Sequence, residues 1–164
     1  MRKLFCLLVA TGAACVWSAG ALAEKFTGTC ECGKSDPQHL LQAGDRPDHT
    51  FGVESAKCSW TKPADLGGDK TKDGVATHMI EISGKKIRFH GVHEVTLQSG
   101  DKVALPYQGN GVSKDNHETQ SHGTFSLGEA TGKLKGIKGK GTFTCKSAGE
   151  GVSCEVEGEY ELAK

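Results

Sequence analysis

The chain has 164 residues, of which 20 are Lys or Arg, 20 are Asp or Glu, 23 are Gly and 10 are aromatic. One domain is expected at this length. The formal net charge of zero argues against a general nucleic-acid binder and against a polybasic membrane-surface protein. Glycine is about twice as frequent as average, without a Gly-X-Y period, which excludes collagen and predicts many tight turns between strands.

The first 23 residues have the pattern of a secretory signal peptide. Arg2 and Lys3 precede an apolar run over 4–16, and Ala21-Leu22-Ala23 fits a small-x-small cleavage site. The run is shorter than the roughly 20 residues of a membrane span. We expect cleavage after Ala23, a single domain over 24–164 with no membrane span, and a periplasmic or secreted location. A lipid-anchored N-terminus at Cys15 is the alternative.

The remaining 141 residues carry a net charge of −2, because both basic residues of the leader are lost and no acidic residue is. An exported chain meets an oxidising compartment, where cysteines form disulfides. Five cysteines remain, so one is left over. They are Cys30, Cys32, Cys58, Cys145 and Cys154.

The chain after the leader shows strand patterns and no good helical stripe in any window of 12 residues. Polar segments over 33–49 and 61–74 are expected to be loops, and Gly84 and Gly100 are expected in hairpin turns. Eight strands are predicted, over 25–32, 50–60, 75–83, 86–97, 102–109, 118–127, 134–145 and 153–162.

Alternation in these strands indicates one buried face. In the segment 86–97 one phase holds Ile87, Phe89, Gly91, His93, Val95 and Leu97. In the last strand the apolar phase runs from Val152 to Leu162, opposite a row of glutamates. Eight such strands without helices predict an all-β fold, an eight-stranded antiparallel barrel, because closure removes exposed edges. A β-sandwich is the alternative.

The strand register also predicts a disulfide. A hairpin centred on 148–151 places Cys145 opposite Cys154, at the spacing that a disulfide needs. By elimination Cys58 pairs with Cys30 or Cys32, which lie two residues apart on one face of a strand. The sequence leaves this choice open. A Cys-x-Cys metal or redox site is the alternative use of these two residues.

Several motifs carry a resemblance to a known family. Segment 131–142 has the sequence TGKLKGIKGKGT, Cys58-Ser59-Trp60 is followed by Lys62-Pro63, and residues 154–160, near the C-terminus, have the sequence CEVEGEY. These motifs resemble those of small exported bacterial proteins of unassigned function related to the allene oxide cyclase and dirigent barrels. The resemblance implies an eight-stranded antiparallel barrel with a possible ligand cavity, often trimeric in the plant relatives. The catalytic residues of those relatives do not map onto positions of this chain.

The glycines of the TGKLKGIKGKGT segment are expected at the coil of one barrel strand. They are Gly132, Gly136, Gly139 and Gly141.

Histidine and tyrosine provide the candidate site. His78 and His93 share the apolar phases of their strands, and His117 is in phase with Phe125. A trio of inward histidines has the ligand type and number of a zinc or copper site, although the spacing is no metal motif. Polar lining of the interior is the alternative. The expected ligand-binding residues of the barrel interior are His78, His93, Tyr107, His117 and Tyr160.

No catalytic, phosphate-binding or cofactor motif occurs in the chain, so the catalytic residues are unknown and no cofactor is expected. The first functional hypothesis is a non-catalytic protein that binds a small apolar or amphiphilic molecule, or serves an envelope role. The alternatives are an isomerase or cyclase-like enzyme that uses the barrel cavity, and a histidine-based metal binder. A homo-oligomer, a trimer by resemblance, is the expected assembly.

Overall fold

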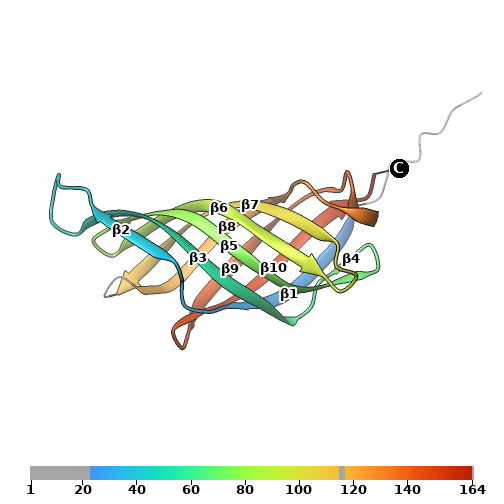
Figure 1. The fold of residues 1–164 in the computed structure, drawn as a ribbon, viewed down its shortest axis with the longest axis horizontal. Helices are drawn as coiled ribbons and strands as arrows, with labels where there is room; N and C mark the ends of the chain where they lie inside the picture. The colour runs from blue at the N-terminus through green and yellow to red at the C-terminus, as the bar shows by residue number, and fades with distance from the viewer. Residues whose placement is uncertain (1–22, 115–116, 164) are drawn as a thin grey trace, which may run out of the picture.

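The computed structural model describes residues 23–114 and 117–163, except for the side chains of residues 117 and 118. The expected signal peptide, apart from Ala23, lies outside these residues. The described part forms strands and one short 3-10 helix, η1 (Figure 1). The elements in chain order are β1 (Glu24–Cys32), β2 (Gln38–Gln42), β3 (His49–Lys62), β4 (Asp65–Leu66), β5 (Asp69–Ser83), β6 (Lys86–Leu97), β7 (Lys102–Lys114), β8 (His117–Leu127), η1 (Gly132–Leu134), β9 (Lys138–Ala148) and β10 (Gly151–Glu161).

Eight of these strands close into an antiparallel barrel, which confirms the predicted fold class. The neighbours follow the order β3-β1-β10-β9-β8-β7-β6-β5, and β5 pairs back onto β3. The two remaining strands are short: β4 pairs with β5, and β2 runs along β3 beyond the end of β1. No helix in the described ranges is long and apolar enough to cross a bilayer.

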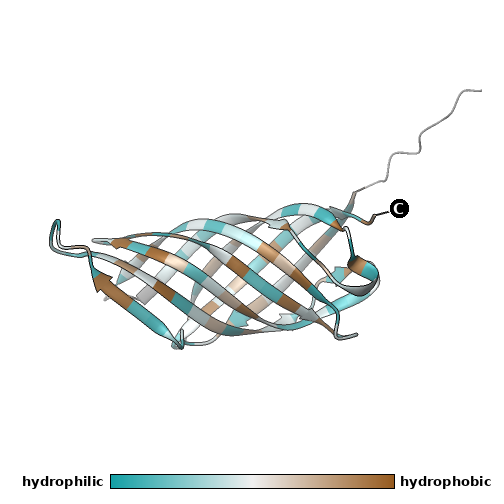
Figure 2. Cartoon of the chain, turned by 45° about the horizontal axis from the view of Figure 1, so that its top comes forward, coloured by the Kyte–Doolittle hydropathy of each residue, from teal (hydrophilic) through white to brown (hydrophobic). Residues whose placement is uncertain are grey.

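The predicted alternation of buried and exposed positions is present in the barrel wall. In β6 the residues Ile87, Phe89, His93, Val95 and Leu97 are buried, while His90 and Glu94 face outward. Figure 2 shows the same alternation as bands of hydrophilic and hydrophobic residues along neighbouring strands. The period of two therefore identified the inner face of this strand correctly.

Three expected segments differ in the structure. β2 lies inside the expected loop 33–49, while β4 lies inside the expected loop 61–74 and β5 begins there, at Asp69. The predicted strand 134–145 begins at Lys138 instead, because Gly132 and Gly136 have φ values of +55° and +81°, which an extended strand does not have. Gly139 and Gly141 alone lie in the strand.

The disulfides follow the strand register. Cys145 and Cys154 are directly opposed across β9 and β10 and form the predicted bridge. Cys58 pairs with Cys32, because β1 and β3 place these two residues opposite each other and set Cys30 opposite Trp60. The option of a Cys30–Cys58 bridge is therefore wrong. Cys30 is a free, buried thiol, and its burial raises its pKa to about 11.

Inward glycines explain much of the glycine content. At these positions an added Cβ would lie within 3 Å of an aromatic ring from a neighbouring strand. The rings therefore lie against bare backbone, which lets a narrow barrel hold large side chains. The pairs are Gly28 with Trp60, Gly109 with Phe89, Gly123 with Phe143, Gly141 with Phe125 and Gly158 with Phe26.

Candidate functional site

A cavity of about 480 Å³ lies inside the barrel, between its two apolar clusters. Most of its wall is apolar and aromatic, and this volume is within the range of roughly 300–1,000 Å³ typical of small-molecule sites. The apolar wall consists of Ala56, Trp60, Ala76, Ile80, Ile87, Phe89, Leu105, Phe125, Phe143, Val152 and Val156.

Small side chains on two adjacent strands leave this space empty. Ala56 of β3 lies directly opposite Ala76 of β5, and both line the cavity. The next strand places His93 opposite Ala76. Because the two alanines end at Cβ, the wall is thinner here than where isoleucine or phenylalanine point inward.

One wall of the cavity holds a chain of polar side chains from three strands. The Glu54 carboxylate of β3 lies 3.5 Å from Nε2 of His78 on β5, and Nδ1 of His78 lies 2.8 Å from the Tyr107 hydroxyl on β7. Ser35 and Gln38 donate hydrogen bonds to the same carboxylate. The polar groups therefore converge on one side of an otherwise apolar space.

Glu54 remains ionised although it is only 8 % exposed. Burial by itself would raise its pKa, but hydrogen bonds from His78, Gln38 and Ser35 outweigh burial and hold the pKa below its usual range. A carboxyl group whose pKa is lower in the folded than in the unfolded chain stabilises the fold when it is ionised.

We therefore expect Glu54→Gln to lose stability at neutral pH, with the difference from the native chain shrinking in acid. The ionised form contributes fully above the unfolded pKa, near 4.5, and its contribution disappears as the pH falls through the lower folded value. Urea unfolding of both proteins between pH 7 and pH 3 measures this. A stability difference that stays constant or grows towards pH 3 would contradict the assignment.

His93 forms a neutral part of the wall. Burial lowers its pKa to about 4, and its ring lies parallel to that of Trp60, with an interplanar angle of 8° and centroids 6.4 Å apart. Nε2 of His93 and Nε1 of Trp60 are buried without a hydrogen-bond partner in the described part of the chain. The pair presents flat aromatic surface and no charge at neutral pH.

The polar rim of the cavity lies where the strand pairing of the barrel wall changes. β1 pairs with β10 as far as Cys32 opposite Val152, and the chain then leaves β10 and continues as β2 along β3 alone. The connection from Gly33 to Gln38 and the tip of the β9–β10 hairpin, residues 147–151, both line the cavity. These segments are the expected point of entry.

The structure brings three of the five predicted site residues to the cavity, namely His78, His93 and Tyr107. Tyr160 does not line it: its hydroxyl donates to the Glu24 carboxylate at 2.6 Å and accepts from the Gly67 amide at 2.8 Å. The side chain of His117 lies outside the described part of the structure. Among the described residues, no group of three His, Cys, Asp or Glu side chains is placed to hold a metal ion.

Sequence reasoning missed Glu54. The sequence contained an indication of this residue's role. Glu54 shares the strand phase of Ala56, Cys58 and Trp60, and it therefore faces inward. A carboxylate in an otherwise apolar phase needs hydrogen-bond partners, which points to a polar cluster. The partners themselves come from distant segments and could not be named from the strand.

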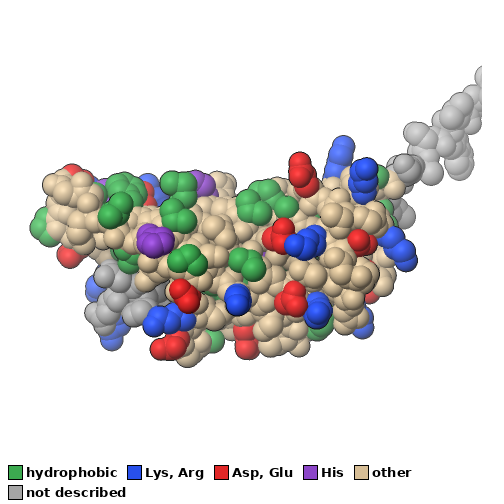
Figure 3. Space-filling view, viewed as in Figure 1, with side chains coloured by type: hydrophobic (Ala, Val, Ile, Leu, Met, Phe, Trp, Pro, Cys, Tyr) green, Lys and Arg blue, Asp and Glu red, His purple; other side chains and the backbone are tan. Residues whose placement is uncertain are grey.

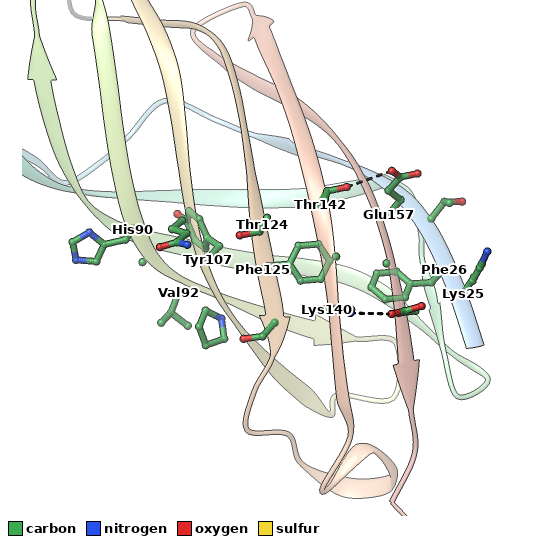
Figure 4. Close-up of a pocket in the computed structure, with 18 residues that line it drawn as sticks. Lys25, Phe26, His90, Val92, Tyr107, Thr124, Phe125, Lys140, Thr142 and Glu157 are labelled. Atoms are coloured by element: carbon green, nitrogen blue, oxygen red, sulfur yellow. Dashed lines mark hydrogen bonds and ion pairs between the residues drawn. The ribbon is translucent and has the colours of Figure 1, made fainter. Parts of the chain in front are cut away.

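A second, larger hollow of about 1110 Å³ is an open groove on the outer surface of the barrel (Figure 4). Three of its charged side chains pair with protein groups: Lys140 lies 3.5 Å from Glu159, and Thr142 donates to Glu157 at 3.3 Å. Apolar side chains gather instead on one half of the outer face (Figure 3). The exposed ones include Leu41, Phe51, Val53, Val75, Met79 and Val92. The interior cavity is therefore the better candidate site for a small molecule.

No family model and no curated protein sequence matches the chain. A solved pterocarpan synthase dirigent protein is similar, with 10% identity and a TM-score of 0.52, covering 96% of this chain and 98% of that one. A DUF3224-family protein of unknown function from Shewanella oneidensis (13% identity, TM-score 0.49, 87% and 99% covered) and a conserved protein of unknown function from Rhodopseudomonas palustris (9%, 0.49, 85% and 99%) are also similar. The first likeness establishes the fold alone: this chain has a dirigent-like β-barrel.

Proposed function

We propose that this protein binds a small amphiphilic molecule inside the barrel. The observation that supports this most directly is the interior cavity of about 480 Å³, which is largely apolar and has a hydrogen-bonded polar chain on one wall. An apolar interior that had no ligand to hold would be expected to close-pack, as protein cores do. Here Ala56 and Ala76 keep the space open at its centre.

The chemistry of the wall defines the ligand class. The apolar and aromatic residues favour a hydrophobic body, and the chain of Glu54, His78 and Tyr107 favours a polar group at one end. A negatively charged group on the ligand fits poorly beside this chain, because Glu54 already holds a negative charge there and His93 is neutral.

Filling the cavity tests the proposal. Phenylnaphthylamine, a neutral dye that fluoresces in apolar surroundings, is expected to bind the native protein with one site per chain. Ala76→Phe places a ring in the cavity, and we expect it to weaken dye binding by at least about tenfold, since one buried site is lost. Val75→Phe is the matched control, because Val75 is the preceding residue on the same strand and faces outward.

The test distinguishes blocking from misfolding. Circular dichroism reports whether Ala76→Phe keeps the barrel, and Ala56→Leu provides a smaller obstruction on the opposite strand. A native protein that binds no dye, or filled variants that bind it as well as Val75→Phe does, would overturn the proposal. Native mass spectrometry of protein purified from its own source then identifies the resident ligand.

Two other functions draw on the same residues. An isomerase or cyclase-like activity would use the chain of Glu54, His78 and Tyr107 to move a proton within an apolar space. Once a ligand is identified, a chemical change in it that native protein causes and His78→Gln does not would favour this function. A histidine-based metal site would need His78 and His93 together with His117; no bound metal in the native mass spectrum would count against it.

We infer export to the periplasm or outside the cell. Two disulfides fit an oxidising compartment, and the leader over residues 1–23 fits a cleaved signal peptide. The same native mass spectrum measures this, because cleavage after Ala23 sets the chain mass. The trimer implied by the resemblance is proposed on the exposed apolar side chains of the outer face, such as Phe51, Val53 and Met79.

A further inference from the structure

β2 is a sheet edge that the barrel leaves open. It pairs with β3 on one side, and on its other side the described structure contains no strand partner. It lies towards one end of the molecule (Figure 1), and its first residue, Gln38, lines the cavity. Closure removes the edges of the eight barrel strands, so among the described strands only β2 and the two-residue β4 keep an open edge.

The hydrogen bonds of β2 show which groups face the open edge. The Pro37 carbonyl accepts from Ser55 and the Ala43 amide donates to His49, so the odd-numbered residues bond to β3. Peptide groups alternate between the two edges of an antiparallel strand. Gln38, Leu40 and Gln42 therefore direct their N–H and C=O groups to the open edge.

β2 is short and follows Pro37, but the strand itself carries no residue that protects its edge. Natural sheets guard exposed edges with charged residues, proline or a bulge. The sequence QHLLQ contains no proline and no Lys, Arg, Asp or Glu, and its pairing with β3 is regular over all five residues. Leu41 on the outer face is 74 % exposed, more than any other large hydrophobic residue described.

The strand is complementary to itself when it is turned around. Antiparallel pairing centred on Leu40 sets Leu40 opposite its own copy, Gln38 opposite Gln42, and His39 opposite Leu41. Leu40 is partly buried against the apolar cluster of Ile80, Ile82, Ile87 and Phe89. Two copies would therefore join apolar to apolar on the inner face and meet no like charges on either face.

We propose that two copies of this chain associate through β2, antiparallel and centred on Leu40. The pairing extends the sheet of one barrel into the other through the edge groups of Gln38, Leu40 and Gln42. It is isologous, with the same strand used by both chains, so this contact joins two chains and no more, independently of any contact that the outer face makes in a trimer. It also covers the edge next to the cavity rim, where Gln38 holds Glu54.

A charge pair in β2 tests both the interface and its register. His39 and Leu41 are exposed, so substitutions there leave the barrel core intact. In H39K/L41K each lysine faces a lysine of the other chain, which we expect to weaken dimerisation by at least about tenfold. In H39E/L41K each glutamate faces a lysine, so the dimer is retained. Sedimentation velocity over a concentration series measures both.

Cysteine cross-linking gives an independent readout. A mixture of H39C and L41C chains is expected to form a disulfide-linked dimer under mild oxidation, because residues 39 and 41 face each other. Each variant alone is expected to cross-link much less. A monomeric native protein, a trimer that H39K/L41K leaves unchanged, loss of association in both charge variants, or no cross-link in the mixture would overturn the proposal.

Discussion

Replacing Cys32 and Cys58 with serine is expected to lower the free energy of unfolding by about 3.5 kcal/mol. The bridge joins residues 26 positions apart, so its loss frees a long loop in the unfolded chain. It also ties β1 to β3 at the end of their short pairing, where Cys32 lies opposite Cys58. The bridge lowers the conformational entropy of the unfolded chain. Its removal therefore stabilises the unfolded state relative to the folded one.

The second bridge provides the comparison. Cys145 and Cys154 are 9 positions apart and join two strands of one hairpin, so the same entropy argument gives about 2.6 kcal/mol. Urea unfolding of the two double-serine variants beside the native protein measures the difference of about 1 kcal/mol. Equal losses, or a larger loss for the hairpin bridge, would show that loop entropy does not decide the order.

Gly123→Ala is expected to cost about 2–3 kcal/mol, because the site has no room for a methyl group. An added Cβ would lie 2.1 Å from the Gln108 carbonyl oxygen and 2.5 Å from the ring of Phe143. The oxygen belongs to the backbone of the neighbouring strand, so the strand pairing itself must shift. Thermal or urea unfolding measures the loss.

Gly33→Ala is the matched control. Its added Cβ would meet the Lys57 carbonyl oxygen at 3.8 Å, an ordinary contact. We expect a change of less than about 0.5 kcal/mol, of either sign. If both alanine variants lose the same stability, the cost comes from glycine replacement in general and not from packing against Phe143.

The sequence located much of the candidate site but not its connections. Strand period placed His78, His93 and Tyr107 on inward faces, and all three line the cavity. The same argument placed Tyr160 inward, where its hydroxyl holds Glu24 and Gly67 at another part of the interior. The two-residue period of a strand identifies which side chains face inward. The height of a side chain along the barrel axis depends on the register of all the strand pairs that separate it from the site.

Local alternation and turn chemistry determined the number of barrel strands, the inner face and the hairpin disulfide, because these depend on neighbours in the chain. Tertiary structure decided the partner of Cys58, since the register between β1 and β3, which a long connection with β2 separates, sets Cys32 and not Cys30 opposite it. It also decided that Glu54 joins His78, and that β2 forms on β3 with one edge open. The sequence alone shows that glycine is abundant. Which aromatic ring lies against which glycine depends on the pairing of strands that are separate in the sequence.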